Sequence, residues 1–280
     1  MNPLEIFLTI SSLTVQTVLC GFVFVRKAQR VLPLFAAYAF VLLISSAGVS
    51  FVNWYWGFTT VAAYVAFWAS AYLYVAAFGL AITELCRYRF RNYPGIWALV
   101  WRLLTGLAVL LVIRAAIDAW GQPNGSEIFG STVMRDFAFG SIVILASLLL
   151  IRNYYGLALD PLQRLIALGM CITCGVDAIG YTLFRNVLTG YLYPLFTMSQ
   201  KALWPVLAPY ARQVDDIWST VHLVSFMIAM GIWCYAFRKP LTVPSEGPVL
   251  LPASVYRKMS PEVNLRLAAF NSRLTELLKP

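Results

Sequence analysis

Seven long apolar stretches, separated by shorter segments that hold most of the charges, follow one another along this 280-residue chain. A helix that crosses a bilayer needs roughly 20 mostly apolar residues, and these stretches have that length. We predict spans near residues 4–25, 33–54, 60–83, 96–119, 131–151, 164–185 and 214–237. Continuous apolar runs favour helices over the short alternating strands of a membrane barrel. The pattern therefore predicts an all-α fold, a seven-transmembrane-helix bundle that occupies residues 1–239.

Basic residues gather after the odd-numbered spans, and this sets the expected orientation. They are Arg26, Lys27 and Arg30 after the first span, Arg87, Arg89 and Arg91 after the third, Arg152 and Arg164 around the loop after the fifth, and Arg238 and Lys239 after the seventh. The short loops 55–59 and 121–129 contain no Lys or Arg. Because cytoplasmic loops carry the excess of basic residues, we expect the N-terminus outside and the C-terminus in the cytoplasm.

Composition identifies the expected partners. Hydrophobic residues make up 60% of the chain and charged residues only 12%, against about 25% charged in soluble proteins. The net charge of +9 lies mostly on the expected cytoplasmic side, where anionic lipids attract it. We therefore expect a lipid bilayer and no nucleic acid as partner, and we predict a multi-pass protein of a bacterial inner membrane.

Two segments outside the spans have patterns of their own. The outer loop 186–213 is aromatic and interrupted by prolines, which favours short interfacial helices that cap the bundle. The cytoplasmic tail 240–280 starts with a Pro-rich linker. Ser260, Pro261 and Glu262 then provide the start signals of an amphipathic helix at 261–278. That helix could dock on the chain itself or bind a cytoplasmic protein.

The side chains needed for several familiar membrane chemistries are missing. Covalent retinal needs a lysine in the last span, and 214–237 has none. His222 is the only histidine, so one chain cannot supply the two axial ligands of a transmembrane b-type haem, and zinc or di-iron sites fail for the same reason. Cys171 and Cys174, one helical turn apart, fit buried core positions. We expect no cofactor, no metal site and no catalytic residue, and enzyme activity stays uncertain, with the balance against it.

Ionisable residues within the spans permit a structural interpretation. Arg114 and Asp118 are one turn apart and could pair on their own helix. Arg135 and Asp136 are adjacent, so their side chains leave the helix about 100° apart and should find partners elsewhere. Nearer the cytoplasm, Glu84 and Arg102 lie beside the arginines at 87–91, which offer Glu84 an ion partner. Candidate structural ion pairs are thus formed by Arg114, Asp118, Asp136, Glu84 and Arg102.

The same residues also permit a functional interpretation, because ionisable groups inside a bilayer are costly and often serve a site. Those in the outer half predict an outward-facing polar pocket, with candidate ligand-binding residues Arg114, Arg135, Asp177, Asp216 and His222. His222 would give this pocket a group that titrates near neutral pH. Aromatic residues of the third span, from Tyr64 to Tyr74, fit either a cavity wall or ordinary packing.

Two short motifs carry a resemblance to other membrane proteins. Trp68-Ala-Ser70, followed by Thr83-Glu84-Leu85 and a basic loop, is similar to a pattern in uncharacterised seven-span integral membrane proteins of environmental bacteria, notably acidobacteria. Leu32-Pro33-Leu34-Phe35 with Tyr38 is similar as well. Those proteins often have an acidic residue where Ala71 stands here. The resemblance implies the fold and the orientation, and no function.

Three functions remain open. The leading one is a receptor-like sensor or small-ligand-binding protein, which should be closed in its cytoplasmic half. A transporter or proton-coupled carrier should show a second polar layer that reaches Glu84 and Arg102. A structural subunit of a membrane complex should present a broad apolar face with small residues, such as the region of Gly169, Cys171 and Gly175, to a neighbour.

Overall fold

A computed structural model describes residues 3–57, 60–89, 94–121, 125–155, 161–187 and 204–238, together with 269, 272–273 and 276–277 of the tail. The helices are α1 Pro3–Val25, the 3₁₀ helix η1 Ala28–Arg30, α2 Pro33–Trp56, α3 Val61–Arg89, α4 Pro94–Ala119, α5 Gly125–Tyr155, α6 Pro161–Val187 and α8 Trp204–Ala236. The described residues contain no strand, so the all-α prediction is confirmed for this part of the chain. Six of these helices, α1 to α6, are long and apolar enough to cross a membrane, which makes this a helical multi-pass bundle. In α8, the part whose side chains the structure describes contains a shorter apolar stretch, Thr220–Ala236.

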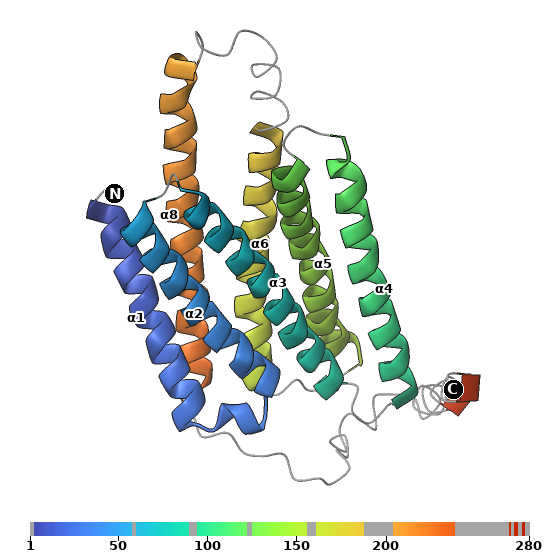
Figure 1. Ribbon diagram of the computed structural model, residues 1–280. Coiled ribbons are helices and arrows are strands. Elements are labelled where there is room, and N and C mark those ends of the chain that lie inside the picture. The colour runs from blue at the N-terminus through green and yellow to red at the C-terminus, as the bar shows by residue number, and fades with distance from the viewer. Residues whose placement is uncertain are drawn as a thin grey trace.

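The helices form a ring with one helix outside it. Along the ring, α1 contacts α2, α2 contacts α3, α3 contacts α5, α5 contacts α6, α6 contacts α8, and α8 contacts α1. Helix α4 packs mainly on α5 and touches α3, and Figure 1 shows it at the edge of the bundle. Most side chains of α4 are exposed. The ring therefore encloses an interior to which α4 does not belong.

Proline and glycine set many of the helix ends. Proline is the first residue of α1, α2, α4 and α6, where its missing N–H and its fixed φ are tolerated. Gly57 follows α2 with a φ of 85°, and Gly121 lies just beyond α4 with a φ of 73°. Glycine adopts this left-handed region without steric cost, so both tight turns can form.

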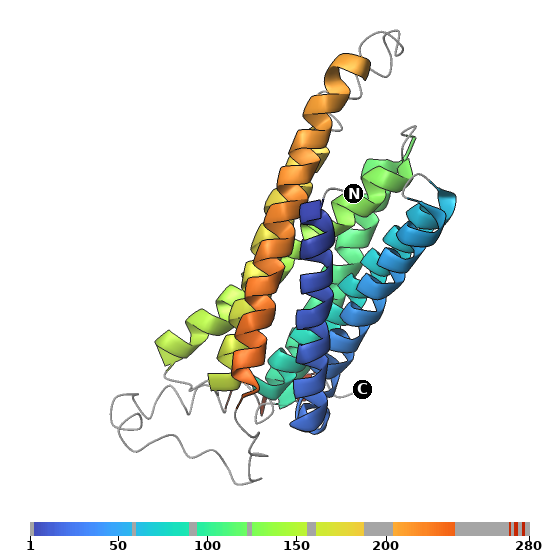
Figure 2. The same ribbon diagram turned by 90° about the vertical axis from the view of Figure 1, so that its left-hand side faces the viewer.

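The largest difference from a predicted boundary is at the start of the last helix. Residues 204–213 were expected in the outer loop, but they belong to α8, which is continuous from Trp204 to Ala236. Figures 1 and 2 show this helix extending well beyond the neighbouring ends of α1 and α2. Pro205 falls in the first turn, where proline does not interrupt helical hydrogen bonding. The rest of the predicted loop cap, and most of the predicted tail helix 261–278, lie outside the described residues.

The end of the ring away from the N-terminus is filled by large aromatic side chains. We call Phe35, Tyr38, Phe78, Trp233 and Phe237 the aromatic plug; all five are at most 1% exposed. Ring centroids lie 5.4 Å apart for Phe35–Trp233, 5.8 Å for Tyr38–Trp233 and 5.3 Å for Tyr38–Phe78, with nearly perpendicular planes. Edge-to-face contacts of this kind are favourable for aromatic pairs. The plug joins α2, α3 and α8 into one packed core.

Trp233 is fixed against α6 by two features. Its Nε1 donates a hydrogen bond to the carbonyl oxygen of Ile166 at 3.1 Å. Its indole ring lies so close to Gly169 that a Cβ atom there would come within 2.3 Å of Nε1. Gly169 thus allows α6 and α8 to approach closely, and it faces the interior of the bundle rather than a neighbouring protein.

Glu84 holds the start of α2 at this same end. Its carboxylate accepts hydrogen bonds from the backbone N–H groups of Leu34, at 3.1 Å, and Phe35, at 2.8 Å. The first N–H groups of a helix have no partner within the helix, and a carboxylate satisfies them well. Glu84 therefore acts as a cap supplied by α3 and fixes the backbone of Phe35, a member of the plug.

Candidate functional site

A cavity of about 390 Å³ lies between the ring helices. It is lined by α1, α2, α3, α5, α6 and α8, and none of its lining residues comes from α4. On α1 the lining residues run from Thr9 to Gln16, and on α2 from Leu42 to Ser50, so the cavity occupies the half of the ring that carries the N-terminus. Phe78 lines the cavity and also belongs to the aromatic plug, which therefore forms the floor.

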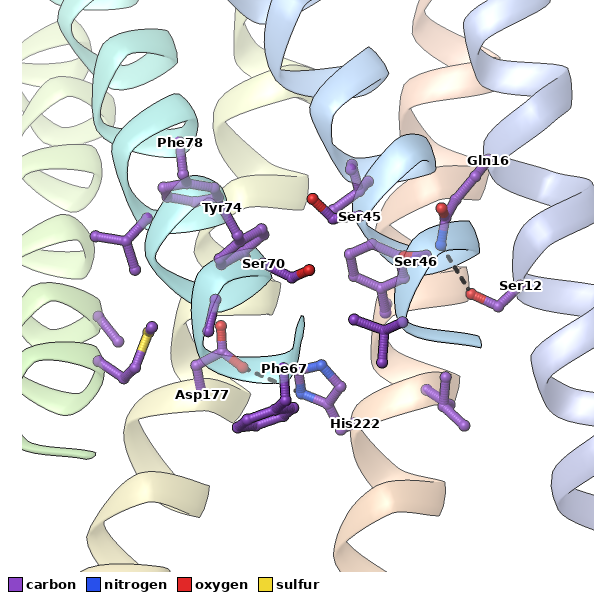
Figure 3. A pocket seen from close by; sticks show the side chains of 18 of the residues that line it. Ser12, Gln16, Ser45, Ser46, Phe67, Ser70, Tyr74, Phe78, Asp177 and His222 are labelled. Carbon is purple, nitrogen blue, oxygen red and sulfur yellow. Dashed lines mark hydrogen bonds and ion pairs between the residues drawn. The ribbon is translucent and has the colours of Figure 1, made fainter. Parts of the chain in front are cut away.

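Small polar side chains form one wall of the cavity. They are Ser12 and Gln16 of α1 and Ser45, Ser46 and Ser50 of α2. Gln16 Nε2 donates a hydrogen bond to Ser12 Oγ at 3.1 Å, which holds the amide in place. Figure 3 shows this pair beside Ser45 and Ser46 at the edge of the open space.

Two polar atoms of this wall stay unsatisfied. Among the residues that the structure describes, no hydrogen-bond partner reaches Gln16 Oε1 or Ser45 Oγ, although both atoms are buried. Gln16 as a whole is only 2% exposed. A buried polar atom without a partner costs roughly 1–3 kcal/mol. Such atoms at the edge of a cavity are what a bound molecule would satisfy.

An acid and the histidine meet on the other side of the cavity. Asp177 of α6 and His222 of α8 both line it, and His222 Nδ1 lies 3.1 Å from Asp177 Oδ1. The Asp177 side chain is 9% exposed. Figure 3 shows the other carboxylate oxygen of Asp177 pointing away from His222. The pair brings a charge and a proton-exchanging group into an otherwise mostly apolar space.

Aromatic rings complete the lining. Phe67 and Tyr74 of α3, Tyr181 of α6 and Phe226 of α8 face the cavity. The His222 and Phe226 rings are nearly parallel, at 10°, with centroids 6.3 Å apart. In the predicted aromatic segment of the third span, Phe67 and Tyr74 line the cavity, whereas Trp68 packs so closely on Gly130 that a Cβ atom there would overlap its ring. The segment thus serves both cavity and packing.

Arg114 and Arg135 form a second cluster around Asp136. Arg114 Nη1 lies 3.3 Å from Asp136 Oδ2, which connects α4 to α5. Arg135 reaches the other carboxylate oxygen, with Nε at 2.8 Å and Nη2 at 2.7 Å. The expectation that Arg135 and Asp136 cannot pair was wrong, because the long arginine side chain bends back around the helix. Neither arginine lines the cavity.

The structure distributes the remaining candidates as follows. Asp118 lies in the last turn of α4 and makes an interaction within the described residues. Arg102 is exposed on α4. Asp216 belongs to α8, but its side chain lies outside the described residues. Of the five predicted ligand-binding residues, Asp177 and His222 are therefore brought together in the cavity.

The serine and glutamine wall was not among the residues predicted from the sequence. Ser12 and Gln16 lie four residues apart, as do Ser46 and Ser50, so each pair shares one helical face. This periodicity of small polar residues within apolar spans was the available signal. Cys174 also lines the cavity and, like Cys171, is a free thiol.

Comparison of the chain with protein-family models, with curated proteins and with solved structures found no match. The resemblance to seven-span proteins of acidobacterial type therefore stays a prediction.

Proposed function

We propose that this chain is a sensor or small-ligand-binding protein of a bacterial inner membrane, with its binding site open toward the outside. The observation that carries the proposal is a cavity with unsatisfied polar atoms above a closed aromatic plug. Ligand sites are typically cavities of about 300–1,000 Å³ with mostly apolar walls and a few fixed polar groups. The cavity described above has this size and this character.

The proposal includes seven spans, with the N-terminus outside. Its support is the placement of side chains at the two ends of the bundle. Trp54, Tyr55, Trp56 and Trp120 are strongly exposed at the end that carries the N-terminus, as expected of an aromatic interface belt. At the other end, Arg26 Nη2 donates a hydrogen bond to the carbonyl oxygen of Arg238, so basic residues that follow α1 and α8 lie together. Positive charge at this end fits the cytoplasmic side.

The plug favours a binder over a continuous path. A carrier should continue the polar lining toward Glu84 and Arg102, but neither residue lines the cavity. A second cavity of about 360 Å³ lies between α3, α4 and α5, and it too is lined by neither Glu84 nor Arg102. Glu84 is engaged by the α2 backbone instead. A signal from the cavity would then reach the cytoplasm through the helices and the proposed tail helix 261–278, which would bind a separate cytoplasmic protein.

A proton-coupled carrier is the second candidate, and one observation favours it. The Asp177–His222 pair faces the cavity, and intramembrane acids next to histidine commonly serve proton relays. In this case the aromatic plug would have to open during each cycle, and Trp233 of α8 would have to leave its contact with α6. Uptake or efflux in vesicles that depends on an imposed pH gradient would favour the carrier over the sensor.

Native mass spectrometry of the purified full-length chain tests the leading proposal. We expect a bound small molecule, and we expect Ala71→Phe, which places a ring into the cavity from α3, to expel it. Ala116→Phe on the exposed face of α4 is the matched control and should retain the molecule. Masses that match the sequences of the native chain and of both variants, with no bound molecule in any of them, would contradict a ligand-binding function.

A further inference from the structure

We propose that the cavity binds a small organic cation, an amine carried by a compact apolar or aromatic body, with its ammonium group at Asp177. This inference rests on the ligand-binding function proposed above and specifies the chemical class of the ligand. It follows from three properties of the cavity, namely the sign of its charge, the kind of hydrogen-bonding atoms it leaves open, and the position of its aromatic rings.

The charge of the lining is the first property. The residues that line the cavity include no Lys or Arg, and Asp177 is the one among them that is an acid. The nearby arginines 114 and 135 are engaged with Asp136 and do not line the cavity. While His222 is neutral, an anionic ligand would therefore meet a carboxylate at short range, whereas a cation would find an opposite charge in a site of low dielectric constant.

The open hydrogen-bonding atoms are the second property. Gln16 Oε1 can only accept a hydrogen bond, and no donor among the described residues reaches it. One oxygen of the Asp177 carboxylate contacts His222, and the other is directed away from it (Figure 3). A ligand that satisfies these two acceptors must bring donors, whereas Ser45 Oγ, the other open atom of the wall, can donate or accept. An ammonium group brings three N–H donors and a charge.

The aromatic rings are the third property. Phe67, Tyr74 and Phe226 surround the space next to Asp177 and His222. Figure 3 shows Phe67 beside the Asp177–His222 pair and Tyr74 above it. Aromatic faces attract cations by about 0.5–2 kcal/mol each and also accept an apolar body. The Asp177–His222 pair would hold the charge, and the rings would hold the rest of the molecule.

His222 acts here as a positioning residue. Its Nδ1 lies against Asp177 Oδ1, and its ring is nearly parallel to that of Phe226, so both partners are held on neighbouring helices. This arrangement turns the carboxylate so that its second oxygen is available to a ligand. The interaction also connects α6 to α8 at the level of the cavity, which places the ligand at the contact of two helices that continue toward the cytoplasmic end.

Three probes of similar shape and different charge test the proposal on the full-length chain in nanodiscs. They are 2-phenylethylamine, 2-phenylethanol and phenylacetate, and the readout is the shift of the melting temperature with probe concentration, which reports binding to the folded state. We expect the amine to bind most tightly, the alcohol at least about tenfold more weakly, and the acid not at all.

Asp177→Asn keeps the shape of the side chain and removes its charge. It should weaken binding of the amine about tenfold or more and change binding of the alcohol by less than about threefold. Glu127→Gln, in the first turn of α5 and away from the cavity lining, changes the net charge equally and should leave both affinities unchanged. If Asp177→Asn does not fold, the ranking of the three probes on the native chain still shows whether the site prefers a cation.

Each alternative outcome has a distinct meaning. Tightest binding of phenylacetate would show an anion site, and equal binding of amine and alcohol would show a neutral hydrogen-bonding site; both would overturn the cation assignment. Failure of all three probes would overturn it as well. In each case a co-purified molecule that Ala71→Phe expels would still support the ligand-binding function, so the two proposals fail separately.

Discussion

The two halves of the helix ring are built by the same helices and packed in opposite ways. On α2, the half with the N-terminus presents Ser45, Ser46 and Ser50 to the interior, whereas the other half presents Phe35 and Tyr38. The first half keeps a cavity and the second half is filled by the aromatic plug. A single helix therefore changes from small polar to large aromatic residues within about two turns.

The contrast extends to how buried polar groups are treated. In the plugged half, Glu84 accepts two backbone hydrogen bonds and Trp233 Nε1 donates one to Ile166. In the cavity half, Gln16 Oε1 and Ser45 Oγ are buried without a partner among the described residues. The plugged half also leaves such an atom, Tyr38 Oη, so the halves differ chiefly in packing, and in the cavity half the unsatisfied atoms face a space where a ligand would offset their cost.

Replacing the centre of the plug should give the largest loss of stability. Trp233→Ala removes a fully buried indole and its hydrogen bond to Ile166, and large-to-small changes of this kind cost about 3–5 kcal/mol. We expect a clearly lowered melting temperature in detergent. If Trp233→Ala lowers the melting temperature no more than Phe226→Ala, at the cavity wall, the two halves are packed equally well.

Gly169 tests the same contact from the opposite helix. Gly169→Ala places a Cβ atom 2.3 Å from Trp233 Nε1, and overpacking of a filled core costs about 1–3 kcal/mol. Gly175→Ala is the matched control, because a Cβ atom there meets nothing within 4 Å and alanine favours a helix over glycine by up to about 1 kcal/mol. Thermal unfolding should shift in opposite directions for the two variants. Shifts of the same sign would contradict the close packing of α6 and α8.

The capping role of Glu84 should show as an intermediate effect. Glu84→Ala leaves the N–H groups of Leu34 and Phe35 without their acceptor, and loss of a helix cap costs about 0.5–2 kcal/mol. Arg102→Ala, on the exposed surface of α4, is expected to change stability by less than about 0.5 kcal/mol. Equal effects of the two variants in chemical unfolding would instead favour the predicted role of Glu84 in a surface ion pair.

The helices could be predicted from sequence more completely than the site, and the reason is physical. Apolar length alone indicates a span, whereas the inward face of a span depends on its neighbours. Asp177 and His222 were proposed for one pocket because both are ionisable and lie in the same half. Gln16 and Ser45 were missed because a small polar residue in a span can also bond to its own backbone, as Thr14 and Thr17 do.

Two other errors have identifiable causes. The prediction that Arg135 and Asp136 find separate partners considered only the direction in which each side chain leaves the helix, and it ignored the length of arginine. The start of α8 was placed too late because Pro205, in an aromatic segment close to Lys201, indicates a loop in isolation. Proline in a first turn is compatible with a helix, but the sequence does not specify which turn is first.

The smallest effect on stability should come from the cavity wall. Gln16→Leu removes a buried amide whose oxygen has no partner among the described residues, together with its hydrogen bond to Ser12. Because these two effects oppose each other, we expect the free energy of unfolding of the empty protein to change by less than about 1 kcal/mol. Thr17→Val, the next residue on α1, is the control, because its hydroxyl bonds to the backbone of Leu13 within the helix. Gln16→Leu should also reduce the bound molecule seen by native mass spectrometry, while Thr17→Val should not. Destabilisation by more than about 1 kcal/mol would mean that Gln16 supports the fold, and the contrast between a packed half and a half that is prepared for a ligand would then fail at this residue.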